Sequence, residues 1–252
     1  MDITLIDITI LIVTGLVAGI INTLAGGGSN LTLPALMIMG MPADIANATN
    51  RVGIFLQCII GILGFRKHKK LETQDLGPIL WPTLIGGLVG ASLASYAPVS
   101  LLKPMLLGVM LTMTLIILIR PSIIIPPPGT IPNRVGDSVR SWGMLLLAGF
   151  YGGFVQAGVG FILIAALAGS LRYDLVRANA LKLVCSLGFT TVALAIFIIN
   201  DQVLWLPGLV LAIGTMAGAH LAVKFAITAK PSTLKWFLFI MTLCGSVAAM
   251  IF

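Results

Sequence analysis

Long apolar stretches, many of them long enough to cross a bilayer, are the feature that most restricts how this chain can fold. Of its 252 residues, 58% are hydrophobic and 9% are charged, whereas an ordinary globular domain carries roughly 25% charged residues. About 20 helical residues cross about 30 Å of hydrocarbon. The sequence therefore predicts an all-α polytopic membrane protein embedded in the lipid bilayer. The predicted crossings are Asp7–Leu24, Ile45–Phe65, Leu76–Tyr96, Leu101–Ile119, Trp142–Gln156, Leu175–Ile199, Val203–Phe225 and Leu234–Ile251.

Two apolar segments are broken by glycine, and a shorter apolar piece follows each break. The run Gly26–Gly28 precedes Leu31–Met39, and Gly158–Gly160 precedes Phe161–Leu171. An unpaired backbone N–H group in hydrocarbon costs several kcal/mol, so a break persists only where protein, water or a ligand satisfies it. We expect each break to form a helix hairpin or a re-entrant segment. A purely structural kink is the alternative.

The two breaks belong to a longer internal repeat. Arg51 and Lys182, one after each break, are 131 residues apart, and Gly86–Ala94 matches Gly214–Ala222 at an offset of 128 residues. Glycines four residues apart let a neighbouring helix approach closely, so we expect these pairs to serve helix packing. Interrupted spans at matching places in two halves are typical of a substrate site at the repeat interface.

The loop charges predict that the two halves are inverted. Arg66–Lys70 is a dense basic cluster in a short loop, and the loop Arg120–Arg140 is also basic, so both should be cytoplasmic. Asn200–Gln202 carries no cation and should face outside. With these assignments the protein is a multi-pass protein of the cell membrane, and both termini face outside.

The predicted fold is two inverted repeats, each a Gly-broken helix hairpin followed by three transmembrane helices. The first repeat covers residues 1–119 and the second covers residues 140–252. Residues 120–139 form a cytoplasmic Pro-rich connector, because Pro126–Pro128 and Pro132 cannot continue a helix.

Arg51 and Lys182 lie deep in matching spans, where cations are costly and usually functional. No Asp or Glu lies in the middle of a predicted span, so the two cations predict a place for an anion. A half-helix beginning at Ser29, and another beginning at Phe161, would add N-terminal N–H groups. Snorkelling cations are the alternative. The predicted substrate-binding residues are Asn22, Gly26, Gly27, Gly28, Ser29, Asn30, Thr49, Asn50, Arg51, Gln156, Gly158, Gly160, Asn179 and Lys182.

These motifs resemble those of one transporter family. The first break, followed by Pro34, Gly40 and Ala48-Thr49-Asn50-Arg51, resembles the TauE/SafE family of membrane transporters. The second break, with Arg177-Ala178 and Lys182, is similar to that family's second repeat. The resemblance covers nearly the whole chain. It implies export or uptake of sulfite and other sulfur-containing anions, including organosulfonates.

We therefore expect a secondary transporter for a small sulfur-containing oxyanion, sulfite or a small organosulfonate, that exports it by alternating access. A passive anion channel, or an uptake carrier for another small organic anion, is the alternative. An enzyme is disfavoured because the spans contain no nucleophile–base pair and no metal-binding cluster. No phosphate-binding loop is present, so ATP is not the direct driver. We expect no cofactor, no metal and no nucleic-acid partner; the proton is one candidate coupling ion.

Overall fold

The computed structural model describes residues 4–71, 73–98, 131–137 and 139–229, together with residues 100, 104 and 233. The predicted crossings Leu101–Ile119 and Leu234–Ile251, and most of the Pro-rich connector, lie outside the described residues. Within the described part all regular structure is helical, and five helices are long and apolar enough to cross a membrane. The described part of the chain is thus all-helical, as predicted, and carries helices suited to cross a membrane.

The helices of the first half follow one another closely. They are α1 (Leu5–Leu24), α2 (Ser29–Ile38), α3 (Ala43–Lys67) and α4 (Leu76–Tyr96). Thr4 starts α1 with a capping box, because its hydroxyl accepts from the Asp7 N–H at 3.2 Å while the Asp7 carboxylate accepts from the Thr4 N–H at 2.9 Å. The predicted break lies between α1 and α2, and α2 begins at Ser29 as expected.

The described helices of the second half have a similar order along the chain. Its helices are α6 (Val139–Phe154), α7 (Val159–Ile164), α8 (Leu175–Ile199) and α9 (Trp205–Thr228). A 3-10 turn at Val135–Asp137 precedes α6, and a π-helical segment at Ala165–Ser170 follows α7. The segment predicted as a crossing at Trp142–Gln156 forms α6, a 16-residue helix that is not among the five long apolar helices.

The helices α3 and α8 correspond closely. Each has 25 residues, and each ends in a turn with a left-handed residue, Lys69 or Asp201, both at φ 55°. The Lys70 N–H donates to the Phe65 carbonyl at 3.0 Å, and the Gln202 N–H donates to the Phe197 carbonyl at 2.9 Å. These are the long hydrogen bonds of the same helix-terminating motif.

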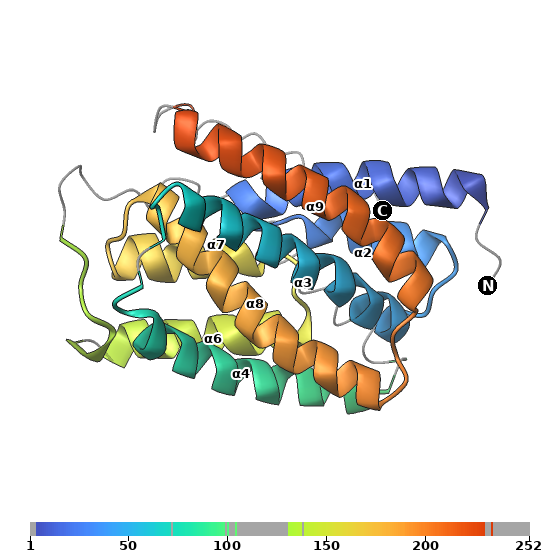
Figure 1. The fold of residues 1–252 in the computed structure, drawn as a ribbon. Coiled ribbons are helices and arrows are strands. Elements are labelled where there is room, and N and C mark those ends of the chain that lie inside the picture. Colours follow the sequence, from blue (N-terminus) through green and yellow to red (C-terminus); the bar gives the residue numbers. More distant parts are fainter. Residues whose placement is uncertain are drawn as a thin grey trace.

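The most extensive helix contacts join one half of the chain to the other. Helix α1 packs on α9, and α6 packs on α4; α3 contacts α9, and α8 contacts α4 (Figure 1). The helices α3 and α8 also contact each other in the centre. Exchanging the two halves of the chain therefore reproduces the same set of contacts.

Glycines make the two closest helix pairs possible. A methyl group on Gly214 would lie 2.3 Å from the Ile12 carbonyl oxygen of α1, and one on Gly218 would lie 2.2 Å from the Leu16 oxygen. On α4, methyl groups at Gly86 and Gly90 would meet carbonyl oxygens of α6 at 2.1 and 2.0 Å. Since backbones touch at these glycines, the prediction that they serve packing is confirmed.

Candidate functional site

The two helix breaks cross each other in the centre of the protein. The Gly160 N–H donates to the Gly26 carbonyl oxygen at 3.2 Å, and a methyl group on either glycine would lie within 2.2 Å of the other's Cα. Gly26 has φ +97° and Gly158 has φ +74°, a region in which side chains are rarely accommodated. The sequence thus uses glycine here both for the turn and for the backbone contact.

Arg51 of α3 binds the end of α6. Its guanidinium donates to the Gly152 carbonyl at 2.5 Å and to the Gly153 carbonyl at 2.8 Å. It also donates to the side-chain oxygens of Gln156 and, at 3.4 Å, Asn47. The guanidinium carbon lies 5.5 Å from the ring centre of Phe197. Arg51 is completely buried.

Lys182 of α8 binds the end of α1 in the corresponding way. Its ammonium group donates to the carbonyls of Asn22 and Thr23, both at 2.9 Å, and to Asn179 Oδ1 at 2.8 Å. The side chain is 1% exposed. Both cations are therefore buried in the protein, and the alternative that they snorkel to the membrane surface is wrong for this structure.

Each cation thus caps the broken helix of the other half. The last carbonyls of a helix have no partner within it and carry the negative end of the helix dipole, so a cation is favourable there. The sequence predicted that Arg51 and Lys182 face an anion. In this structure carbonyl oxygens of α6 and α1 each accept two hydrogen bonds from one cation, side-chain amide oxygens accept the others, and the three donors of Lys182 are all used.

The start of α2 is tied to α3. Asn50 donates from its amide to the Ser29 hydroxyl at 3.1 Å and accepts from the Thr32 hydroxyl at 2.6 Å. Gly28 packs against α1, since a methyl group there would lie 2.7 Å from Asn22 Cβ. The structure therefore brings the predicted Asn22, Ser29 and Asn50 together beside the first break.

Gly27 and Thr49 have different surroundings. A methyl group on Gly27 would lie 2.9 Å from the ring of Phe161, so it faces the second hairpin. The hydroxyl of Thr49 accepts from the Leu204 N–H at 3.1 Å. Thr49 therefore holds the start of α9.

Several residues of the site were not predicted. Thr190 donates to Gln156 Oε1 at 3.2 Å, and Gln57 donates to the Thr23 hydroxyl at 3.4 Å. Asn47 also donates to the Phe154 carbonyl at 2.9 Å. Asn47 lies four residues before Arg51 on the same helix, so helical spacing could have identified it.

A few buried polar atoms near these groups have no hydrogen-bond partner. They include two donors, Arg51 Nε and Asn179 Nδ2, and two side-chain amide oxygens, those of Asn30 and Gln57. Buried polar atoms are rarely left unpaired in a native protein. An amide can also turn over and present its NH₂ group. Next to two cations, such a set can bind a small group with acceptor oxygens.

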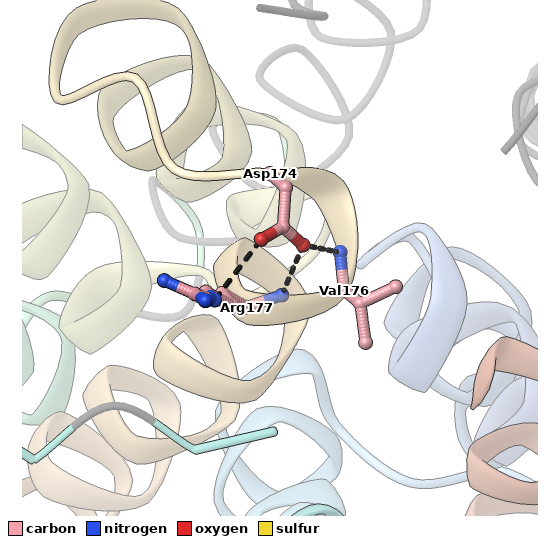
Figure 2. Close-up of polar contacts among 3 residues, drawn as sticks. All are labelled: Asp174, Val176 and Arg177. Atoms are coloured by element: carbon pink, nitrogen blue, oxygen red, sulfur yellow. Dashed lines mark hydrogen bonds and ion pairs between the residues drawn. The ribbon is translucent and has the colours of Figure 1, made fainter. Parts of the chain in front are cut away.

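The start of α8 is fixed by its own cap (Figure 2). The Asp174 carboxylate accepts from the N–H groups of Val176 and Arg177 at 3.0 and 3.1 Å, and it pairs with the Arg177 Nε at 3.1 Å. A carboxylate at this position favours the helix N-terminus. This cap holds the helix that carries Asn179 and Lys182.

Two crossing interrupted helices with buried polar groups at their crossing, in a protein of long apolar helices, are typical of membrane transporters. Comparison with known protein families supports the assignment to membrane transporters. The chain matches the family described as "Sulfite exporter TauE/SafE" over residues 11–249. Because the match spans nearly the whole chain, this protein belongs to the TauE/SafE family.

Three relatives match this chain over most of its length. The "Probable membrane transporter protein" of Haemophilus influenzae is 30% identical over 244 residues, 96% of this chain and 94% of the relative. The "Probable membrane transporter protein YfcA" of Escherichia coli K12 is 26% identical over 225 residues, 87% of this chain and 80% of the relative. A third, "Probable membrane transporter protein ORF9" of Sinorhizobium sp, is 25% identical over 235 residues, 92% of this chain and 88% of the relative.

Proposed function

We propose that this protein is a secondary transporter that exports a small sulfur-containing oxyanion, sulfite or a small organosulfonate, and binds it where the two helix breaks cross. One observation carries the proposal: Arg51 and Lys182 are both buried beside the crossing, and within the described residues their hydrogen bonds go to carbonyl and amide oxygens rather than to a carboxylate. Carbonyl dipoles offset two positive charges only in part. A bound anion would lower the cost of keeping these charges inside the membrane.

The unpaired donors suggest how the anion is held. Arg51 Nε and Asn179 Nδ2 come from the two halves of the chain. A tetrahedral or pyramidal oxyanion presents several acceptor oxygens and suits donors that come from more than one direction. The "Sulfite exporter" description of the family supports a sulfur oxyanion as the substrate class.

Alternating access is the proposed mechanism, with the halves acting as inverted repeats. Two observations support the repeat. The helix contacts stay the same when the two halves of the chain are exchanged, and α3 and α8 have the same length. In Figure 1, α1 begins at the right of the view and α6 at the left, which suits repeats of opposite direction. Rocking of one helix group against the other would open the site to each side in turn.

A binding screen tests the substrate class. We expect sulfite or a small organosulfonate to raise the unfolding temperature of the purified protein, because a ligand at 100 times its Kd stabilises the folded state by about 2.7 kcal/mol. The screen compares sulfite, sulfate, thiosulfate, sulfoacetate, taurine and simple carboxylates. Stabilisation by carboxylates alone would exclude a sulfur oxyanion and favour the organic-anion carrier.

Flux in proteoliposomes separates a transporter from a channel. A transporter gives saturable uptake and counterflow of labelled anion against unlabelled anion, whereas a passive channel gives flux without counterflow. The same assay, with product analysis, would also reveal any chemical change of the anion.

Labelling of a single cysteine tests the topology. Both termini are proposed to face outside, and the loop with Arg66–Lys70 to face the cytoplasm. His68 is exposed at the end of α3, so a His68→Cys variant should react with a membrane-impermeant reagent only after the cytoplasmic side is opened. The described cysteines, Cys58 and Cys185, are buried and give little background. Reaction of residue 68 in intact cells would contradict this orientation.

A further inference from the structure

A second basic site lies at the end of α3, away from the crossing of the breaks. It is a pocket of about 260 Å³ between the turn after α3 and the first turn of α8. Its lining residues are Lys69, Lys70, Leu71, Thr73, Gln74 and Arg177. None of these residues is among the predicted or observed residues of the central site, so the pocket needs its own explanation.

The backbone around the pocket is held in place by hydrogen bonds. The Lys69 N–H donates to the Arg66 carbonyl and the Lys70 N–H donates to the Phe65 carbonyl, both at 3.0 Å. At the other end of the loop, the Tyr173 hydroxyl donates to the Asp75 carboxylate at 2.9 Å. The two lysines therefore come from an ordered turn joined to the segment before α8.

The charges that surround the pocket favour an anion. Its described lining contains two lysines and an arginine, with the hydroxyl of Thr73 and the amide of Gln74 as further polar groups. Asp75 and Asp174, from the adjoining segments, are not among its lining residues: Asp75 accepts from Tyr173, and Asp174 caps α8 and pairs with Arg177. The described lining thus carries the two lysines, an arginine that is paired with Asp174, and several hydrogen-bond donors.

The pocket lies at the ends of helices that are long and apolar enough to cross a membrane. The long apolar helices α3, α4 and α8 end or begin around it, at Lys67, Leu76 and Leu175. Trp81, one turn into α4, is 67% exposed, as is common for tryptophan at the membrane interface. The pocket therefore lies at the depth of the lipid headgroups, where phosphate is concentrated.

We propose that this pocket binds the phosphate headgroup of an anionic phospholipid. Lys69 and Lys70 contact the phosphate oxygens, while Thr73 and Gln74 bind polar atoms of the headgroup. Leu71 provides an apolar wall on the way to the acyl chains. This site does not depend on which anion the protein carries, since it shares no residue with the central site.

The test is lipid binding by the purified full-length protein in neutral phosphatidylcholine nanodiscs, titrated with phosphatidylglycerol. We expect the double variant Lys69→Gln/Lys70→Gln to bind phosphatidylglycerol about tenfold or more weakly than the unsubstituted protein. The matched control is Arg66→Gln/Lys67→Gln, which removes the same charge from the same helix end but spares the pocket lining. The control should lose at most about threefold in affinity.

Three outcomes would overturn the proposal. They are an equal loss in both double variants, equal binding of phosphatidylglycerol and added phosphatidylcholine, and displacement of the lipid by millimolar inorganic phosphate. The last outcome would indicate a site for free phosphate. If the first double variant does not fold, Lys70→Gln against Lys67→Gln makes the same comparison with one charge each. Lys69→Arg/Lys70→Arg should retain binding.

Discussion

Replacing Gly26 with alanine should destabilise the protein far more than replacing Gly40. Both glycines have φ near +90°, at +97° and +89°, so alanine meets similar backbone strain at each, roughly 1–2 kcal/mol. Only at Gly26 does the new methyl group strike backbone, 2.2 Å from the Cα of Gly160, whereas nothing lies within 4 Å of it at Gly40. Overpacking of this kind costs about 1–3 kcal/mol or more.

Thermal unfolding of the purified variants in detergent measures this difference. The Gly160→Ala variant adds an independent check, because Gly160 has no left-handed φ but would place its methyl group 2.1 Å from the Gly26 Cα. It should lose stability like Gly26→Ala. Equal unfolding temperatures for Gly26→Ala and Gly40→Ala would show that the two breaks do not touch as described.

Neutralising either buried cation should reduce both stability and anion affinity. In Arg51→Gln the carbonyls of Gly152 and Gly153 lose their donor, and in Lys182→Gln those of Asn22 and Thr23 do. Each unpaired buried acceptor costs about 1–3 kcal/mol. Arg51→Gln also removes the unpaired Nε and its charge-assisted hydrogen bond to the anion, which should weaken anion binding about ten- to a hundredfold. Lys182→Gln removes a neighbouring positive charge and should weaken anion binding through the lost electrostatic attraction. Unfolding temperature and ligand-dependent stabilisation are measured on the same samples.

Further variants separate the capping role from the binding role. Arg51→Lys keeps the charge but not the fork of donors, so it should be milder than Arg51→Gln and still harmful. Lys224→Gln removes an exposed cation of α9 and serves as the charge control. In Asn179→Asp, Oδ1 can still accept from Lys182, while the added carboxylate takes the place of an anion. That variant should stay folded and lose the response to anion. Unchanged affinity in all folded variants would leave Arg51 and Lys182 as helix caps only.

Local features of the fold could be predicted from the sequence. The positions of the breaks follow from glycine runs inside apolar stretches, because both signals lie within a few residues of each other. The predicted start of α2 at Ser29 is confirmed. Helix α7 begins at Val159, two residues before the predicted start, because the left-handed turn at Gly158 lets the new helix begin at once. The change from α-helix to π-helix after Ile164 has no signal in the local sequence.

The partners of the cations could not be predicted in the same way. Arg51 and Lys182 were identified because a charge in an apolar span is conspicuous. Two side-chain acceptors, Gln156 and Asn179, were among the predicted site residues. The other main acceptors are backbone carbonyls 101 to 160 residues away, and a backbone carbonyl has no residue-specific signal in the sequence. The predicted anion site relied on the N–H groups that are freed where the two half-helices begin. A break equally frees the carbonyls where the preceding helices end, and these are the carbonyls that Arg51 and Lys182 contact.

The exchanged caps have a consequence for how the chain is made. When α1 enters the membrane, the carbonyls of Asn22 and Thr23 need a donor that lies 160 and 159 residues further along, at Lys182. Carbonyls left bare in hydrocarbon are costly, so the first broken helix cannot reach its final state while the ribosome is still producing the connector. Its assembly is completed only after α8 has been synthesised. A truncated first half would therefore present an unfinished helix end to lipid or to the cell's quality-control machinery.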